Sequence, residues 1–247
     1  MRFLPVQAVL PDVRIYPYVC DEVNAIYTQL YQHRGPIIRQ LTPSLNHLEG
    51  PHWDAEKQLL FFVDISDHKV YQYNPYDGRL TFAHIGATVG AVIPIQGTKT
   101  KFLIGAGTSL AVLTWNGRNV TSPFIQVLTT VDRDKPGNRF NDGKADAVGR
   151  LWIGTMGIEN PVGVVAPNRG TLFRAANNSC QLEPIFTGVS ISNGLAWSLD
   201  NRFMFYIDSP TKRVEKFDYN LLSGTLMMID HVHRRYLTHG RCLKRSV

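Results

Sequence analysis

The sequence predicts an all-β protein built from repeated four-stranded units. Its short apolar segments are rich in β-branched and aromatic residues and end at turn-forming residues, a pattern typical of strands. One block of sequence recurs farther along the chain at a spacing that fits several such units. No segment after residue 45 shows the sustained periodicity of an amphipathic helix.

Strands are predicted wherever an apolar run of four or five residues is followed by a turn signal. These signals include the dipeptides Asn116-Gly117 and Ser223-Gly224. The glycine-rich stretch at residues 105–109 lacks the third glycine of a dinucleotide-binding loop, so it is interpreted as a turn between two strands. In chain order, the predicted strands cover residues 59–63, 69–73, 102–105, 111–115, 151–154, 171–174, 203–207 and 214–217.

An internal repeat organises these strands. The segment that begins Glu49-Gly50 aligns with the segment that begins Asn193-Gly194, 144 residues later, and the match continues through the following strands without a gap. The region around Asn141 resembles a third copy. Because 144 is three times 48, and a propeller blade of four strands has about 40–50 residues, we predict a β-propeller. Its four blades are expected near residues 49–88, 89–136, 137–188 and 189–226.

Polar residues at the start of each repeat are candidates for a site on the propeller axis, because equivalent positions of successive blades form a ring. These residues are Glu49, either Asn141 or Asp142, and Asn193. Carboxylate and amide oxygens suit calcium, magnesium or manganese. Glu-Gly and Asn-Gly pairs are equally typical of turns, so both interpretations remain open on the repeat alone.

Composition narrows the range of partners. The 247 residues are 44% hydrophobic, which suits one folded domain, and no run of 18 apolar residues predicts a membrane span. Residues 227–247 hold five basic side chains against Asp230, so most of the +6 net charge lies there and the body is nearly neutral. We therefore expect neither a nucleic-acid nor a membrane partner. Three widely spaced cysteines favour a reducing, cytoplasmic location.

Four motifs together resemble the gluconolactonase/regucalcin family. The resemblance covers about residues 42–226, and the long loop at residues 129–137 is similar to the insect branch of the family, which includes luciferin-regenerating enzyme. The motifs occur in the expected order and spacing. They are His47-Leu48-Glu49-Gly50-Pro51-His52-Trp53, Arg139-Phe140-Asn141-Asp142-Gly143-Lys144-Ala145-Asp146, Trp152-Ile153-Gly154-Thr155-Met156 and Ser192-Asn193-Gly194-Leu195-Ala196-Trp197-Ser198.

The resemblance implies a six-bladed propeller that binds one divalent cation on its axis and hydrolyses a sugar lactone. It implies that Glu49 and Asn193 are metal ligands and that Arg139, Asn141 and Glu159 contact the substrate. Calcium is the favoured cation, with zinc, magnesium or manganese as alternatives. No catalytic general base is assigned.

The sequence departs from the family pattern in one respect that concerns the metal. A third ligand is expected from the aspartate of a Pro-Asp-Gly motif, and this motif is absent. The resemblance ends after Leu226, so the chain is expected to be C-terminally truncated and to hold about four of the six blades. Asp208 is equivalent to Asp64 in the repeat and is therefore predicted to cap a turn or strand end, without binding metal.

The sequence thus predicts three regions: an atypical N-terminal extension (residues 1–41), a propeller domain (42–226) and a basic divergent tail (227–247). The leading functional hypothesis is a monomeric, metal-dependent lactone hydrolase of the gluconolactonase type. The alternatives are a non-catalytic calcium-binding regulatory protein and an inactive truncated isoform. A solvated terminus is the favoured interpretation of the tail, ahead of a zinc site or an anion-binding segment.

Overall fold

The computed structural model describes residues 40–176 and 180–228. The predicted N-terminal extension and basic tail therefore lie almost entirely outside the described residues. Within these two ranges the chain forms sixteen strands and one short 3-10 helix, η1 (Ser209–Thr211). None of the helices in these ranges is long and apolar enough to cross a membrane.

The strands form four antiparallel sheets, each made of four strands that follow one another in the sequence. We refer to the sheets as blades 1 to 4. Blade 1 contains β1 (Leu48–Asp54), β2 (Leu59–Asp64), β3 (Lys69–Tyr73) and β4 (Leu80–His84), and blade 2 contains β5 (Val89–Pro94), β6 (Lys101–Ala106), β7 (Ser109–Thr114) and β8 (Phe124–Thr130). Blade 3 contains β9 (Arg139–Ala145), β10 (Leu151–Met156), β11 (Gly170–Ala175) and β12 (Leu182–Val189), and blade 4 contains β13 (Ser192–Trp197), β14 (Phe203–Asp208), β15 (Glu215–Asn220) and β16 (Thr225–Met228).

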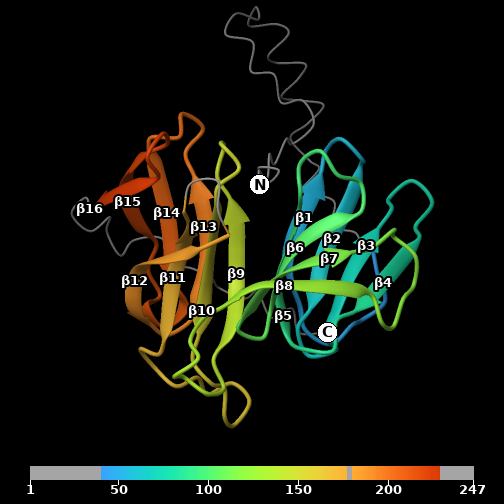
Figure 1. Cartoon of the computed structure of the whole chain (residues 1–247), viewed down its shortest axis with the longest axis horizontal. Coiled ribbons are helices and arrows are strands. Elements are labelled where there is room, and N and C mark those ends of the chain that lie inside the picture. The colour runs from blue at the N-terminus through green and yellow to red at the C-terminus, as the bar shows by residue number, and fades with distance from the viewer. Residues whose placement is uncertain (1–39, 177–179, 229–247) are drawn as a thin grey trace, which may run out of the picture.

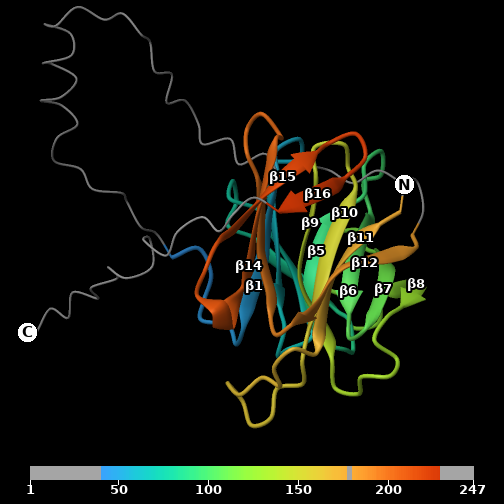
Figure 2. The same cartoon turned by 90° about the vertical axis from the view of Figure 1, so that its left-hand side faces the viewer.

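The blades are arranged as in a β-propeller, which confirms the predicted fold class. The first strand of each blade is the inner one, and β1, β5, β9 and β13 each contact the next in this order. Figure 1 shows blades 1 and 2 on one side and blades 3 and 4 on the other, with β5 and β9 between them. Figure 2 shows the same arrangement with blade 4 turned toward the viewer.

Apolar side chains fill the three interfaces between neighbouring blades. Full burial of one such side chain contributes about 1.5–3 kcal/mol, whereas a typical hydrogen bond contributes about 1 kcal/mol net. Apolar packing at these interfaces therefore contributes more than hydrogen bonds to holding neighbouring blades together. In order along the chain, the interfaces bring together Val63, Val70, Phe102 and Leu113; Ile93, Leu103, Phe140 and Ile153; and Trp152, Leu172, Met204 and Phe217.

The inner strands carry irregularities at equivalent places. The pairing of β1 with β2 shifts after Glu49, and the pairing of β13 with β14 shifts after Asn193. Gly50 and Gly194 follow these two residues, and both have φ +55°, a left-handed conformation that glycine adopts without strain. In blade 3 the pairing is interrupted at residues 141–142. Such bulges redirect side chains. The polar residue at the start of each of these three repeats therefore lies at a bulge of its inner strand.

Candidate functional site

The residues that sequence analysis selected lie on three inner strands. Glu49 is on β1, Arg139 and Asn141 are on β9, and Asn193 is on β13. The negative charge of Glu49 influences the pKa of both Arg139 and Asp142, so the Glu49 carboxylate lies near each of these two side chains. Glu159 lies in the loop after β10, and its charge also influences Arg139. The structure therefore brings the predicted residues of blades 1 and 3 together.

A single backbone N–H joins the polar side chains of blades 3 and 4. The Gly194 N–H donates to Oδ2 of Asp142 at 2.9 Å and to Oδ1 of Asn193 at 3.1 Å. The two side-chain oxygens therefore lie beside one another. The other end of the Asn193 amide, Nδ2, donates to Oγ of Ser209 at 3.1 Å.

The surroundings of Asp142 disfavour its negative charge. Burial raises the pKa of Asp142 above its ordinary value, and the nearby Glu49 carboxylate adds to this effect. The N–H groups of Gly143, at 2.8 Å from Oδ1, and of Gly194 oppose it. The repeat had offered Asp142 as an alternative to Asn141, whereas the family resemblance had not assigned it a role.

Arg139 and Asn141 form a fixed pair. Nη1 of Arg139 donates to Oδ1 of Asn141 at 2.9 Å and to the Phe140 carbonyl at 3.1 Å. Nδ2 of Asn141 donates to the Ser192 carbonyl at 2.9 Å, which ties β9 to β13. Burial lowers the pKa of Arg139, while Glu159 and Glu49 oppose that shift. A guanidinium remains charged in proteins, so a positioned cation lies next to the acidic residues.

Glu159 lies at the exposed rim of this group. Its Oε1 accepts a hydrogen bond from the Gly163 N–H at 2.6 Å, and residue 159 pairs with Val165 across a short bridge. The carboxylate is thus held by its own loop while it acts on Arg139 electrostatically.

Lys144 is a further charged residue that sequence reasoning did not select. Burial lowers its pKa, and Asp142 opposes that shift. Lys144 follows Asp142 by two positions on β9, so the two side chains lie on the same face of the strand. The two-residue period of a strand was the signal that could have identified Lys144.

The contacts of His52 and Asp208 indicate that both residues stabilise the fold. His52 is only 3% exposed, and burial lowers its pKa from 6.5 to about 4, so it is neutral at neutral pH. The Asp208 carboxylate accepts the N–H groups of Ser190 at 3.1 Å and Ile191 at 2.9 Å. This confirms the prediction that Asp208 is a cap. Asp64 accepts the N–H groups of residues 46 and 47 in the equivalent way.

The oxygen donors of the site suit a hard divalent cation. Glu49 and Asp142 offer carboxylates and Asn193 offers an amide oxygen, which are ligand types of calcium, magnesium and manganese. Over residues 40–176 and 180–228, no group of three or more His, Cys, Asp or Glu side chains forms a metal cluster. The candidate donor set thus contains only two carboxylates, those of Glu49 and Asp142, and its third member is the amide of Asn193.

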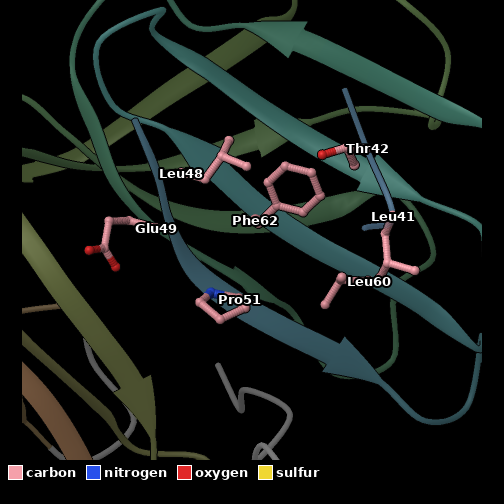
Figure 3. Close-up of a pocket in the computed structure, with 7 residues that line it drawn as sticks. All are labelled: Leu41, Thr42, Leu48, Glu49, Pro51, Leu60 and Phe62. Atoms are coloured by element: carbon pink, nitrogen blue, oxygen red, sulfur yellow. The ribbon is translucent and has the colours of Figure 1, made fainter. Parts of the chain in front are cut away.

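An apolar pocket of about 250 Å³ adjoins Glu49 on blade 1. Figure 3 shows the Glu49 carboxylate pointing away from the apolar side chains of the pocket. The acidic group and the apolar surface are thus separate parts of the same blade. Besides Glu49, the lining residues are Leu41, Thr42, Leu48, Pro51, Leu60 and Phe62.

Comparison with known proteins gives consistent results. Regucalcin of Xenopus laevis is 36% identical over 176 residues, which are 71% of this chain and 56% of the relative. Regucalcin of Gallus gallus is 37% identical over 72% of this chain and 57% of its own length. The solved structure of a luciferin-regenerating enzyme is 35% identical, with a TM-score of 0.68 over 73% of this chain and 58% of that chain.

The chain spans less than three fifths of the length of these relatives. A family model described as the SMP-30/Gluconolactonase/LRE-like region matches residues 48–234 and so extends beyond Leu226, where the motif resemblance ended. That match covers most of the sequence and includes every residue of the candidate site. The chain belongs to the SMP-30/gluconolactonase/LRE-like family.

Proposed function

We propose that this protein is a metal-dependent lactonase that opens the ring of a sugar lactone. The observation that carries the proposal is the placement of the Glu49 carboxylate near both the Arg139 guanidinium and the Asp142 carboxylate. The family to which the chain belongs includes gluconolactonases by name, which supports this choice of reaction. The proposal also takes the protein to be a cytoplasmic monomer that acts on a small, freely diffusing substrate.

Glu49, Asn193 and Asp142 would hold the divalent cation, with calcium as the first choice. A bound cation of this kind polarises a carbonyl oxygen and lowers the pKa of a bound water. Asp142 would take the place of the third ligand, the aspartate that the absent Pro-Asp-Gly motif would supply. Its raised pKa fits this role, because a cation would relieve the repulsion between the Asp142 and Glu49 carboxylates.

Arg139 and Asn141 would bind and orient the substrate. The guanidinium is fixed on Oδ1 of Asn141 at 2.9 Å, so its remaining N–H groups are available to ring hydroxyls or to a carbonyl oxygen that gains negative charge. Glu159 at the exposed rim supplies a carboxylate that accepts hydrogen bonds from sugar hydroxyls. No side chain of this site is assigned as the general base.

The proposal is tested by hydrolysis of gluconolactone by the whole chain, with and without added calcium. The parent should turn over substrate only with the cation, and Glu49→Gln should lower kcat/KM by roughly 100-fold or more, because a ligand of the cation is lost. Glu56→Gln, an exposed substitution on the same blade, should leave the activity unchanged. Equal activity of the parent and Glu49→Gln would contradict the proposal.

A non-catalytic calcium-binding protein is the second candidate. The oxygen-only donor set, which suits calcium, supports it. In that case calcium should raise the melting temperature of the parent, and Glu49→Gln should abolish the rise, while no lactone is hydrolysed.

A further inference from the structure

We propose that Ser209 is a positioning residue that holds the Asn193 amide with its oxygen toward the cation. This inference rests on the proposed cation site. Oγ of Ser209 accepts a hydrogen bond from Nδ2 of Asn193 at 3.1 Å. The Ser209 hydroxyl is therefore in direct contact with a proposed ligand of the cation.

An amide ligand must be oriented because its two ends have the same shape and opposite polarity. In Asn193 the two ends have different partners. The Gly194 N–H can only donate and lies at 3.1 Å from Oδ1, whereas the Ser209 hydroxyl can accept and lies at Nδ2. The Gly194 N–H selects the orientation because it can only donate, and the Ser209 hydroxyl, which can donate or accept, holds Nδ2 in that orientation. The opposite orientation would direct an NH2 group at the cation.

The backbone of Ser209 is held independently of its hydroxyl. Its N–H donates to the Ile191 carbonyl at 3.2 Å, and the Asp208 carboxylate binds the N–H groups of Ser190 and Ile191. Pro210 follows it in the 3-10 helix η1. Loss of the hydroxyl should therefore leave the turn in place and release only the Asn193 amide.

The internal repeat provides an independent comparison. Ile65 is equivalent to Ser209, since each lies 16 residues after its repeat head and donates its N–H to an equivalent carbonyl, at 3.0 Å and 3.2 Å respectively. The repeat head in blade 1 is Glu49, a carboxylate with two equivalent oxygens. Such a group needs no orienting partner, and the equivalent residue Ile65 offers none. Of these two closely aligned repeats, the one whose head residue is an amide carries the serine.

The test measures calcium binding by calorimetry on the full chain. Ser209→Ala should weaken the affinity about 10–100-fold, the usual cost of removing a group that orients a ligand, and should leave the metal-free melting temperature unchanged. Ser209→Thr keeps the hydroxyl and should restore the affinity. Thr211→Ala, the matched control, removes a hydroxyl that donates to the Asp208 carbonyl in the same turn and should leave the affinity unchanged.

A second arm uses Asn193→Asp, which replaces the amide by a carboxylate that needs no orientation. In this background Ser209→Ala should change calcium affinity by less than about twofold, because the coupling between the two residues is lost. An unchanged affinity of Ser209→Ala in the parent, an equal loss in the Asp background, or a loss that Ser209→Thr does not restore would each overturn the role of Ser209. If the parent binds no calcium, the proposed cation site fails, and the role of Ser209 fails with it.

Discussion

The charged side chains near the axis lie in surroundings that oppose their charges. Burial raises the pKa of Asp142 and lowers those of Arg139 and Lys144. Each is partly compensated by a different neighbour: Asp142 by two N–H groups, Arg139 by Glu159, and Lys144 by Asp142. Perturbed groups of opposite sign close together are typical of functional sites, and here all three come from β9 of blade 3.

The buried His52 should make the stability of the protein depend on pH. Its pKa is lowered from 6.5 to about 4, so the unfolded chain binds a proton that the folded chain excludes. The associated stability is complete above pH 6.5 and is lost as the pH falls toward 4, by about 3 kcal/mol. The free energy of unfolding of His52→Asn, measured by denaturant titration from pH 7 to 4.5, should fall less than that of the parent. Equal pH slopes would contradict this prediction.

The position of a strand in its blade determines how well the sequence predicts it. All eight predicted strands are the middle strands of the four blades, and the last begins at Glu215, one residue later than expected. Middle strands are largely apolar because they pack against neighbouring blades, on both faces in blades 2 and 3 and on one face in blades 1 and 4. Inner strands such as β9 carry the polar and glycine residues of the axis, and outer strands such as β12 are largely exposed. Most of their sequences therefore lack the apolar pattern of a strand. The inner strand β5 is an exception, because its residues are apolar and buried throughout.

The candidate site was predictable to a similar extent. The repeat placed Glu49 and Asn193 at equivalent positions, because a fixed blade length maps sequence spacing onto a ring. Contacts between blades have no such period. The hydrogen bond from Gly194 to Asp142 depends on the bulge in β13 and on how closely β13 packs against β9. For this reason the partner of Asp142 could be found only in the structure.

Gly90 on β5 allows blades 2 and 3 to pack closely. A Cβ added at Gly90 would lie 2.4 Å from the Asn141 carbonyl oxygen and 2.5 Å from that of Phe140. Because these are backbone atoms, β9 would have to move. Gly90→Ala should cost about 2–3 kcal/mol of unfolding free energy and should also weaken calcium binding, since Asn141 and Asp142 move with β9.

Gly78→Ala is the matched control for this substitution. Gly78 has φ +69° and no atom within 4 Å of an added Cβ, so only backbone strain of about 1 kcal/mol is expected. Calcium affinity should be unchanged in this variant. If Gly90→Ala destabilised the protein no more than Gly78→Ala, the close approach of β5 and β9 would not limit the packing of the blades.

At the scale of the whole molecule, a buried ion pair in blade 3 is hydrogen-bonded to blade 4 away from the axis. Arg150 is paired with Asp146, whose side chain is fully buried, at 2.9 Å. The same guanidinium donates to the hydroxyl of Tyr219 at 3.0 Å and to the carbonyl of Leu222 at 3.0 Å, both in blade 4. The Tyr219 hydroxyl in turn donates to Asp146. Blade 4 is therefore attached to blade 3 both at the inner strands and at this outer contact.

Removal of Arg150 should loosen blade 4 selectively. Arg150→Ala leaves Asp146 buried without its cation, so the unfolding free energy should fall by about 3–5 kcal/mol. Amide hydrogen exchange should accelerate in β15 and β16, while β2 and β3 keep the exchange rates of the parent, because blade 1 does not contact this ion pair. Tyr219→Phe keeps the ion pair and should cost only about 1–2 kcal/mol. Equal acceleration in all four blades would contradict this prediction. It would show that the blades unfold as one unit and that the Arg150 contact stabilises the whole propeller.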